Sequence, residues 1–199
     1  MRMEIEQVLI GRARIAHRVR DLGVLIASDM AATTPAPFVL VPILTGSFVF
    51  VADLIRHMPL KMSIRPITVS SYPGRATQSQ GVEVRGEVPT DLGGKHVLLV
   101  DDILDSGRTL GLIQRMIAAQ GPASLRTAVL LRKEKPAGRA EEVAVDYVAF
   151  NIGDRFVVGY GLDYDGYFRN LPDICVLRDP EGAEPWAEVA TGGAAGGRV

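Results

Sequence analysis

Residues 97–110 read Val97-Leu98-Leu99-Val100-Asp101-Asp102-Ile103-Leu104-Asp105-Ser106-Gly107-Arg108-Thr109-Leu110, and they predict the architecture of the whole chain. The first four are apolar without interruption, which is typical of a strand buried on both faces of a sheet. The acidic and glycine-containing residues after them predict a turn, and apolar residues then recur at helical spacing over Thr109–Gln120. The segment therefore predicts a buried strand that ends at two acids, a polar turn and a helix.

The same alternation of strands and helices continues on both sides of this segment. Helical spacing of apolar residues predicts helices over Ile10–Met30 and Phe48–Met58. The polar, glycine-rich segment 73–94 is expected to be a mobile loop, and such loops in compact domains are usually functional or disordered. Strands that alternate with helices favour an α/β fold with a parallel sheet. Short apolar runs predict the other strands at Phe38–Ile43, Ile64–Ser71, Leu125–Leu131, Val145–Phe150, Phe156–Tyr160 and Ile174–Leu177.

Length, charge and cysteine content narrow the class of protein. The chain has 199 residues, which suits a single domain over residues 1–179, followed by a tail at 180–199 that we expect to be disordered. Lys and Arg total 22 and Asp and Glu total 23, so the basic excess of a nucleic-acid-binding protein is missing. One cysteine, Cys175, excludes an internal disulfide and suits a reducing compartment. No apolar run is long enough to span a bilayer, so we expect no membrane partner. With the balanced charge and the single cysteine, this predicts a cytoplasmic protein without nucleic-acid partners.

The acids and hydroxyls of residues 97–110 suit a ligand that carries both a phosphate and hydroxyl groups. Ligands of open α/β sheets bind beyond the carboxyl ends of the strands, and a helix N-terminus presents free N–H groups to a phosphate. Gly107 allows close approach of the backbone, and Ser106 and Thr109 add hydroxyl donors. Asp101 and Asp102 suit ribose hydroxyls or a Mg²⁺ ion. The structural alternative is a turn with solvated acids, but two acids after an apolar strand serve no packing purpose.

The order of residue types in this segment closely resembles the 5-phosphoribosyl-1-pyrophosphate signature of type I phosphoribosyltransferases. It matches neither the P-loop nor the dinucleotide-binding motif. The resemblance extends from about Glu6 to Asp179 and implies that family's fold: a central, mostly parallel sheet flanked by helices, with a small hood subdomain, formed by the terminal segments, over the C-terminal strand edge. Other segments follow the hypoxanthine (guanine) branch in order and spacing: Leu44-Thr45-Gly46-Ser47, Ser70-Ser71-Tyr72, Lys135-Pro136, Phe156–Tyr164 and Tyr167-Phe168-Arg169.

The resemblance implies a Mg²⁺-dependent reaction in purine salvage. Phosphoribosyl pyrophosphate would react with hypoxanthine or guanine to give IMP or GMP and pyrophosphate, in a homodimer or homotetramer. Asp105 would be the general base, or the hydrogen-bond partner, at the purine imidazole nitrogen. Mg²⁺ would be bound by Asp101, Asp102 and Asp163. The residues implied for phosphoribosyl pyrophosphate are Leu44, Thr45, Gly46, Asp101, Asp102, Ser106, Gly107, Arg108, Thr109 and Arg169.

The resemblance also implies a purine site and a lid. Lys135 would donate to the exocyclic oxygen of a 6-oxopurine and so discriminate against the amino group of adenine. Phe156 would stack on the base, Val157 would contact its edge through the main chain, and Asp163 would lie nearby. Ser71 and Tyr72 would belong to a lid that shields the reaction from water. An exposed surface lysine and an ordinary core strand are the structural alternatives for Lys135 and for Phe156-Val157.

Several points stay open at the level of sequence. Thr45 stands where many relatives have a basic residue, and Gly153 stands where proline is common. The peptide bond between Leu44 and Thr45 is expected to be cis, as is frequent in relatives. Two alternative functions stay open. The chain could be a regulatory RNA-binding protein on the same scaffold, or a transferase for xanthine or another base. The sequence does not rank hypoxanthine against guanine.

Overall fold

A computed structural model of the chain describes residues 5–32, 36–70, 83–84, 88–135 and 138–178. Within this described part, seven strands form a sheet in the order β5-β4-β2-β6-β7-β8, with β3 paired to β2. All of these pairs are parallel except β4 with β5. The strands are β2 (Phe38–Leu44), β3 (Met62–Ile64), β4 (Ile67–Ser70), β5 (Glu83–Val84), β6 (His96–Leu104), β7 (Ser124–Lys133) and β8 (Tyr147–Ile152).

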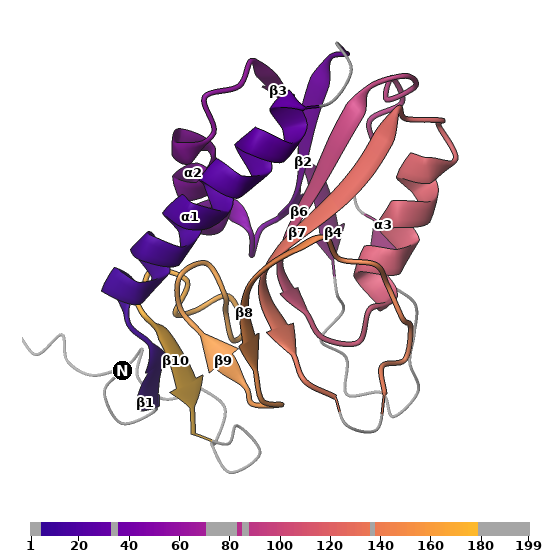
Figure 1. The fold of residues 1–199 in the computed structure, drawn as a ribbon. Coiled ribbons are helices and arrows are strands. Elements are labelled where there is room, and N and C mark those ends of the chain that lie inside the picture. The colour runs from indigo at the N-terminus through magenta and orange to yellow at the C-terminus, as the bar shows by residue number, and fades with distance from the viewer. Residues whose placement is uncertain (1–4, 33–35, 71–82, 85–87, 136–137, 179–199) are drawn as a thin grey trace, which may run out of the picture.

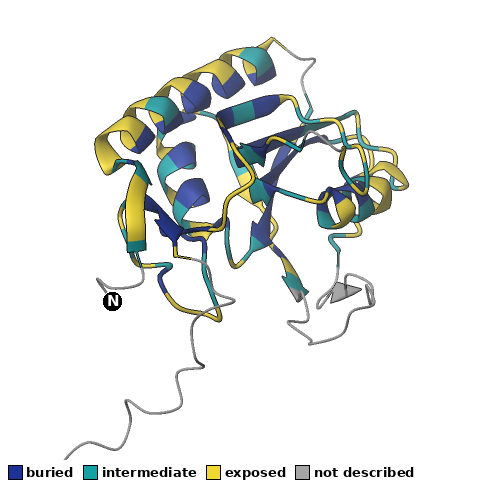
Figure 2. Cartoon of the chain, turned by 90° about the horizontal axis from the view of Figure 1, so that it is seen from below, coloured by how far each residue is buried: buried dark blue, intermediate teal, exposed yellow. Residues whose placement is uncertain are grey.

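Helices cover both faces of this sheet. Figure 1 shows α1 (Arg12–Ala31) and α2 (Phe48–Leu54) on one face and α3 (Arg108–Ala118) on the other. A 3₁₀ turn at Ile55–His57 follows α2 directly. The inner face of α1 carries apolar side chains at intervals of three or four residues, and Figure 2 shows this buried face toward the sheet and an exposed face toward solvent. The buried residues of that face are Ile15, Val19, Leu22, Ile26 and Met30.

The core has two halves because β6 is buried on both faces. Leu98 and Val100 belong to the half that α1 and α2 cover. Val97 and Leu99 belong to the half that α3 covers. Side chains alternate between the two faces of a strand, so an uninterrupted apolar run fills both halves. None of the helices in the described residues has the length and apolar character needed to cross a lipid bilayer.

A second, three-stranded sheet lies at the end of the large sheet where the parallel strands finish (Figure 1). It consists of β1 (Ile5–Ile10), β10 (Ile174–Leu177) and β9 (Val157–Val158), all antiparallel. The backbone N–H of Arg12 donates to Asp173 Oδ1 at 2.7 Å, and its guanidinium pairs with Asp173 Oδ2 at 2.9 Å. These bonds join the start of α1 to the segment before β10. The small sheet is the predicted hood.

The predicted fold is confirmed, and three details differ. The central strand does not end at the acids, because β6 continues through Asp101 and Asp102 to Leu104 and pairs with β7 over this length. The strand predicted at Ile64–Ser71 is split into β3 and β4 around Pro66, which has no N–H to donate to a ladder. The N-terminal strand β1 was not predicted at all.

Parts of the sequence-based description lie outside the described residues. The tail at 180–199 and the two lid residues, Ser71 and Tyr72, belong to this group. Most of the glycine-rich segment 73–94 does too, although β5 lies within it. The predictions for these residues stay predictions.

Candidate active site

A cavity of about 350 Å³ opens where the carboxyl ends of β2, β6 and β7 face the hood. This edge is where open α/β sheets bind their ligands. Most of the predicted site residues line the cavity, although they come from four separate segments of the chain. The predicted residues among its lining are Leu44, Thr45, Gly46, Asp101, Asp102, Asp105, Ser106, Gly107, Thr109, Phe156, Val157, Asp163 and Arg169.

The turn before α3 forms one wall of the cavity. Gly107 has φ +83°, a left-handed conformation that side chains disfavour. A Cβ atom at this position would overlap the carbonyl oxygen of Glu141. The N–H of Glu141 in turn donates to the carbonyl of Ser106 at 3.0 Å, so the two segments are held together. The turn therefore places Ser106, Thr109 and the N-terminus of α3 at the cavity, an arrangement that suits an anion.

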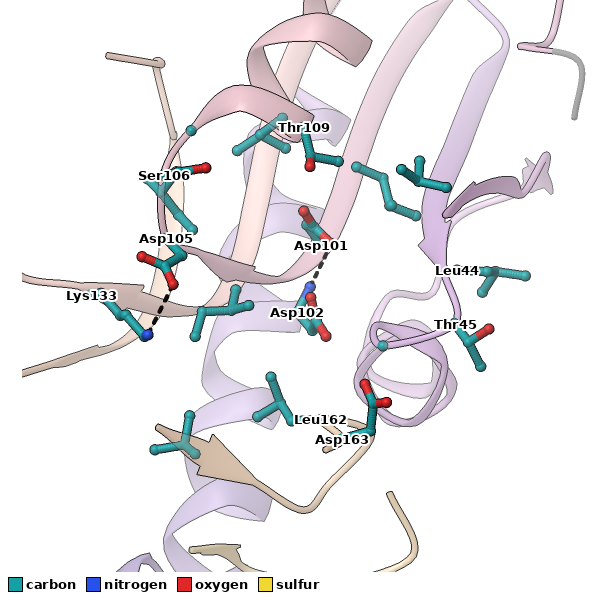
Figure 3. A pocket seen from close by; sticks show the side chains of 18 of the residues that line it. Leu44, Thr45, Asp101, Asp102, Asp105, Ser106, Thr109, Lys133, Leu162 and Asp163 are labelled. Carbon is teal, nitrogen blue, oxygen red and sulfur yellow. Dashed lines mark hydrogen bonds and ion pairs between the residues drawn. The ribbon is translucent and has the colours of Figure 1, made fainter. Parts of the chain in front are cut away.

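The acid pair lies at the centre of the cavity (Figure 3). Asp101 is buried, and its Oδ1 accepts a hydrogen bond from the backbone N–H of Asp102 at 3.0 Å. Burial, and then the neighbouring charge of Asp102, raise the pKa of Asp101 well above its usual range. Burial also raises the pKa of Asp102. Two adjacent carboxyl groups with raised pKa values favour the binding of a cation or of hydroxyl donors.

The turn after β2 lies against this acid pair. The Leu44–Thr45 peptide bond is cis, as the sequence comparison with the family led us to expect. A side chain at Gly46 would overlap the carboxylate of Asp102, so the backbone of this turn approaches the acid directly. Figure 3 shows Leu44 and Thr45 across the cavity from Asp105 and Ser106.

Arg169 and Asp163 form a fixed pair on the hood side of the cavity. One guanidinium nitrogen of Arg169 donates to the carbonyl of Gly161 at 2.7 Å, and the other pairs with Asp163 Oδ1 at 2.9 Å. Asp163 Oδ2 accepts from the N–H of Gly166 at 2.8 Å. These bonds fix the planar donor fork of the arginine, a group that suits phosphate oxygens.

Phe156 and Val157 form the base of the hood wall. Val157 is buried within β9, where it pairs with Val176 of β10. Phe156 is 41% exposed, and its ring makes a T-shaped pair with Tyr164, with ring centroids 5.5 Å apart. Because Phe156 also lines the cavity, it offers an aromatic surface to a flat ligand.

Two lysines at the end of β7 reach the cavity wall: Lys133 lines the cavity, and the predicted Lys135 contacts Asp105, which lines it too. Lys133 is the last residue of β7, its side chain is only 11% exposed, and its ammonium donates to Asp105 Oδ2 at 2.9 Å (Figure 3). Lys135 lies two residues further and pairs with Asp105 Oδ1 and Asp154 Oδ2, each at 2.8 Å. Alternation along an extended segment places residues i and i+2 on one side, and this signal in the sequence would have indicated both lysines.

Two opposing effects act on the carboxyl group of Asp105. Partial burial raises its pKa, but the hydrogen bonds and charges of Lys135 and Lys133 outweigh this and lower the pKa overall. Asp105 is therefore held as a carboxylate at the mouth of the cavity. Arg108, by contrast, is exposed, and its side chain does not belong to the cavity wall.

Residues 12–165 match the phosphoribosyl transferase domain family. The chain is 39% identical over 176 residues to the hypoxanthine-guanine phosphoribosyltransferase of Streptococcus pneumoniae, covering 88% of this chain and 95% of that relative. Identity to the Mycobacterium avium enzyme of the same name is 41% over 181 residues, or 89% and 87% of the two chains. The fold is similar to that of the Staphylococcus aureus hypoxanthine phosphoribosyltransferase, with a TM-score of 0.81, 35% identity and coverage of 92% and 97%. The chain therefore belongs to the type I phosphoribosyltransferases, in the hypoxanthine-guanine phosphoribosyltransferase branch.

Proposed function

We propose that this chain transfers the 5-phosphoribosyl group of phosphoribosyl pyrophosphate to a 6-oxopurine, hypoxanthine or guanine. The products are IMP or GMP and pyrophosphate, and the reaction belongs to purine salvage. The observation that carries the proposal is one cavity in which a helix N-terminus, a buried acid pair and an aromatic ring meet. A phosphate, ribose hydroxyls and a flat base each find a matching group there. The relatives named above, which are hypoxanthine-guanine phosphoribosyltransferases, support the same reaction.

The two phosphate-bearing ends of phosphoribosyl pyrophosphate are assigned to opposite walls. Residues 106–109 hold the 5-phosphate through backbone N–H groups and the hydroxyls of Ser106 and Thr109. Arg108 contributes its backbone only, because its side chain is not part of the wall. The Leu44–Gly46 backbone and the Arg169 guanidinium hold the pyrophosphate.

The acid pair is assigned to the ribose hydroxyls and to Mg²⁺. Within the described residues, no cluster of three or more His, Cys, Asp or Glu side chains could hold a metal by itself. Mg²⁺ usually takes one or two carboxylates together with substrate phosphates and waters, so the pair Asp101 and Asp102 fits an ion that arrives with pyrophosphate. Asp163 fits a second such ion through the free lone pairs of its two oxygens. When bound, Mg²⁺ neutralises charge on the leaving pyrophosphate.

Purine recognition is assigned to Phe156, Val157 and Lys135. The Phe156 ring stacks on the base, and the main chain at Val157 contacts the ring edge. Lys135 is assigned to the exocyclic oxygen, as the resemblance implies, and its ammonium contacts Asp105 of the cavity wall at 2.8 Å. An ammonium has donors only, so it favours the exocyclic oxygen of a 6-oxopurine over the amino group of adenine.

Asp105 is assigned to the purine imidazole nitrogen. As the other imidazole nitrogen forms its bond to the anomeric carbon, the bond to pyrophosphate breaks, and the proton of the N–H that faces Asp105 passes to the Asp105 carboxylate. The lysines lower the pKa of Asp105, so the group is a carboxylate at neutral pH, the form that can accept the hydrogen bond and the proton. Stabilisation of the leaving group by Arg169 and the loop at Leu44–Gly46 supplies the electrostatic part of catalysis.

The proposal is tested by measuring nucleotide formation from phosphoribosyl pyrophosphate and Mg²⁺ with hypoxanthine, guanine, xanthine and adenine in turn. We expect turnover with hypoxanthine or guanine and none with adenine. Asp105→Asn is expected to lower kcat by about 100-fold or more, the usual contribution of a general base, with little change in phosphoribosyl pyrophosphate binding. Absence of turnover with every 6-oxopurine would overturn the proposal.

Two further expectations accompany this function. A homodimer or homotetramer is proposed for the assembly, which gel filtration with light scattering would measure, and a cytoplasmic location is proposed for the chain. The regulatory RNA-binding alternative is not favoured, because the relatives are enzymes over nearly their whole length.

A further inference from the structure

A buried tyrosine of the hood is bonded to the helix that follows the turn at Leu44–Gly46, which we call the pyrophosphate turn. The hydroxyl of Tyr160 donates to Asp53 Oδ2 at 2.7 Å, although 107 positions separate the two residues in the chain. Tyr160 is 7% exposed, and Asp53 belongs to α2, which begins at Phe48 directly after the turn. Burial, and then the bond to Asp53, raise the pKa of the Tyr160 phenol, so the hydroxyl stays protonated and donates.

The backbone next to Tyr160 carries an acceptor for Arg169. The guanidinium of Arg169 donates to the carbonyl of Gly161 at 2.7 Å, and the N–H of Gly161 donates to the carbonyl of Arg169 at 3.0 Å. A Cβ atom at Gly161 would overlap the carbonyl of Gly46, so the two backbones lie against each other. A displacement of residues 160–161 would therefore move the arginine relative to the pyrophosphate turn.

The backbone of Tyr160 depends on the contacts around it. Its φ is +52°, a left-handed conformation that residues with a side chain disfavour and that persists where surrounding contacts hold it. Its N–H donates to the carbonyl of Leu171 at 2.7 Å, and the hydroxyl bond to Asp53 fixes the far end of the side chain. The hydroxyl bond is the contact that ties this strained residue to α2.

Arg169 lies between two cavities. It lines the site cavity, and together with Tyr160 and Asp53 it also lines a second cavity of about 670 Å³. With space on both sides, the long side chain depends on its bonds to Gly161 and Asp163 for its place. The position of the Gly161 carbonyl therefore decides where the guanidinium lies.

We propose that Tyr160 is a positioning residue for pyrophosphate, because its bond to Asp53 keeps the guanidinium of Arg169 at a fixed distance from the pyrophosphate turn. The inference rests on the proposed function and adds to it two residues, neither of which is assigned a contact with substrate. Arg169 and the turn each supply part of the pyrophosphate site from a different region of the chain. Donors that are already in place bind an anion more tightly, because less ordering is left for the binding step.

The test measures the dissociation constants of pyrophosphate with Mg²⁺ and of IMP by calorimetry, in the wild type and in Tyr160→Phe. IMP carries the 5-phosphate and the base but no pyrophosphate, so it reports on the rest of the site. Tyr160→Phe should weaken pyrophosphate binding by about 3- to 10-fold, somewhat less than the full loss of one hydrogen bond to a charged group. The dissociation constant of IMP should change less than about twofold, because its assigned contacts are untouched.

Two substitutions of Asp53 address the same bond from the other side. The Asp53 side chain is 45% exposed, so its replacement leaves the core intact. Asp53→Ala removes the acceptor and should weaken pyrophosphate binding as Tyr160→Phe does. Asp53→Asn keeps an acceptor oxygen while removing the charge, and should bind pyrophosphate as the wild type does. Combining Tyr160→Phe with Asp53→Ala should cost no more than either change alone, because both remove one bond.

Tyr147→Phe is the matched control for a general loss of stability. Tyr147 is 5% exposed, and its hydroxyl donates to Asp29 of α1 at 2.9 Å, so this variant also removes a bond between a buried tyrosine and a helix. Tyr147 is the first residue of β8, whereas the cavity opens at the carboxyl ends of the parallel strands. Both tyrosine variants should lower Tm, and only Tyr160→Phe should weaken pyrophosphate binding.

Four outcomes would reject the inference: unchanged pyrophosphate binding in Tyr160→Phe and Asp53→Ala, an equal loss for IMP, an equal loss in Tyr147→Phe, or a loss in Asp53→Asn as large as in Asp53→Ala. Failure of the proposed function looks different, because the wild type would then form no nucleotide from phosphoribosyl pyrophosphate and any 6-oxopurine. A wild type that forms nucleotide, with a Tyr160→Phe variant that binds pyrophosphate equally well, rejects the positioning role alone.

Discussion

Substitution of Gly107 by alanine tests whether the turn before α3 has the conformation described above. The left-handed φ of +83° costs a non-glycine residue about 1–2 kcal/mol. The new Cβ would also overlap the carbonyl of Glu141, and moving that carbonyl breaks the 3.0 Å bond from Glu141 N–H to Ser106, worth about 1 kcal/mol. Together these effects predict a loss of about 2–3 kcal/mol in the free energy of unfolding.

Gly121→Ala is the matched control for this experiment. Gly121 has φ +67°, but a Cβ there meets nothing within 4 Å. Its substitution should therefore cost only the backbone part, about 1–2 kcal/mol. Urea denaturation measures both values, provided that the m-values stay equal. Because Gly107 belongs to the proposed phosphate loop, only Gly107→Ala should also weaken binding of phosphoribosyl pyrophosphate in calorimetry, by about tenfold for one lost hydrogen bond to a charged group.

The reasoning fails if the two substitutions cost the same free energy and leave binding equal. That result would mean that Glu141 does not restrict the turn. If Gly107→Ala lowers stability but leaves binding unchanged, the contact with Glu141 is supported. The assignment of the turn to phosphate is then rejected.

Three other substitutions address the acids and Arg169. Asp101→Asn should raise the free energy of unfolding at pH 7, because it removes a carboxyl group whose ionisation burial disfavours, while weakening phosphoribosyl pyrophosphate binding. The raised pKa means that wild-type stability falls as pH rises through it, and urea denaturation against pH should show this fall absent in the variant. Arg169→Lys should raise the KM for phosphoribosyl pyrophosphate by about tenfold, because an ammonium cannot hold both Asp163 and a phosphate with a fork of donors. The hydrogen bond from Arg12 lowers the pKa of Asp173 in the folded protein. The pair therefore stabilises the fold at pH values above the pKa of this carboxyl in the unfolded chain, and the stabilisation is lost as pH falls through its pKa in the folded protein. Asp173→Asn should lower Tm at pH 7 and match wild type in acid.

Much of the fold follows from local patterns in the sequence. Val97–Val100 is apolar on both faces, and only a central strand buries both, so its place in the sheet was predictable. The phosphate turn was predictable for a similar reason, since Ser106, Gly107 and Thr109 lie within four positions at the start of a helix. These features depend on neighbours in sequence.

The missing features depend on partners that are distant in sequence. β1 is mostly exposed and is a strand because β10 provides its ladder, so its own pattern was weak. The contact of Lys133 with Asp105 was not predicted, because it depends on how far β7 continues beside β6 and β8. The extension of β6 through its acids has the same origin, because Ile103 and Leu104 find partners in β7.

The pairing of β1 with β10 has a consequence for biosynthesis. Ile10 pairs with Ile174, so the hood can form only after the last described strand, β10, has left the ribosome. Val157 of β9 has its ladder partner, Val176, in that same strand. The large sheet, with the turns proposed to hold phosphoribosyl pyrophosphate, is complete well before then, and domains generally begin to fold from the N-terminal side during synthesis. A nascent chain therefore completes the wall that carries Leu44–Gly46 and residues 106–109 first, and the wall that carries Phe156, Val157 and Arg169 last.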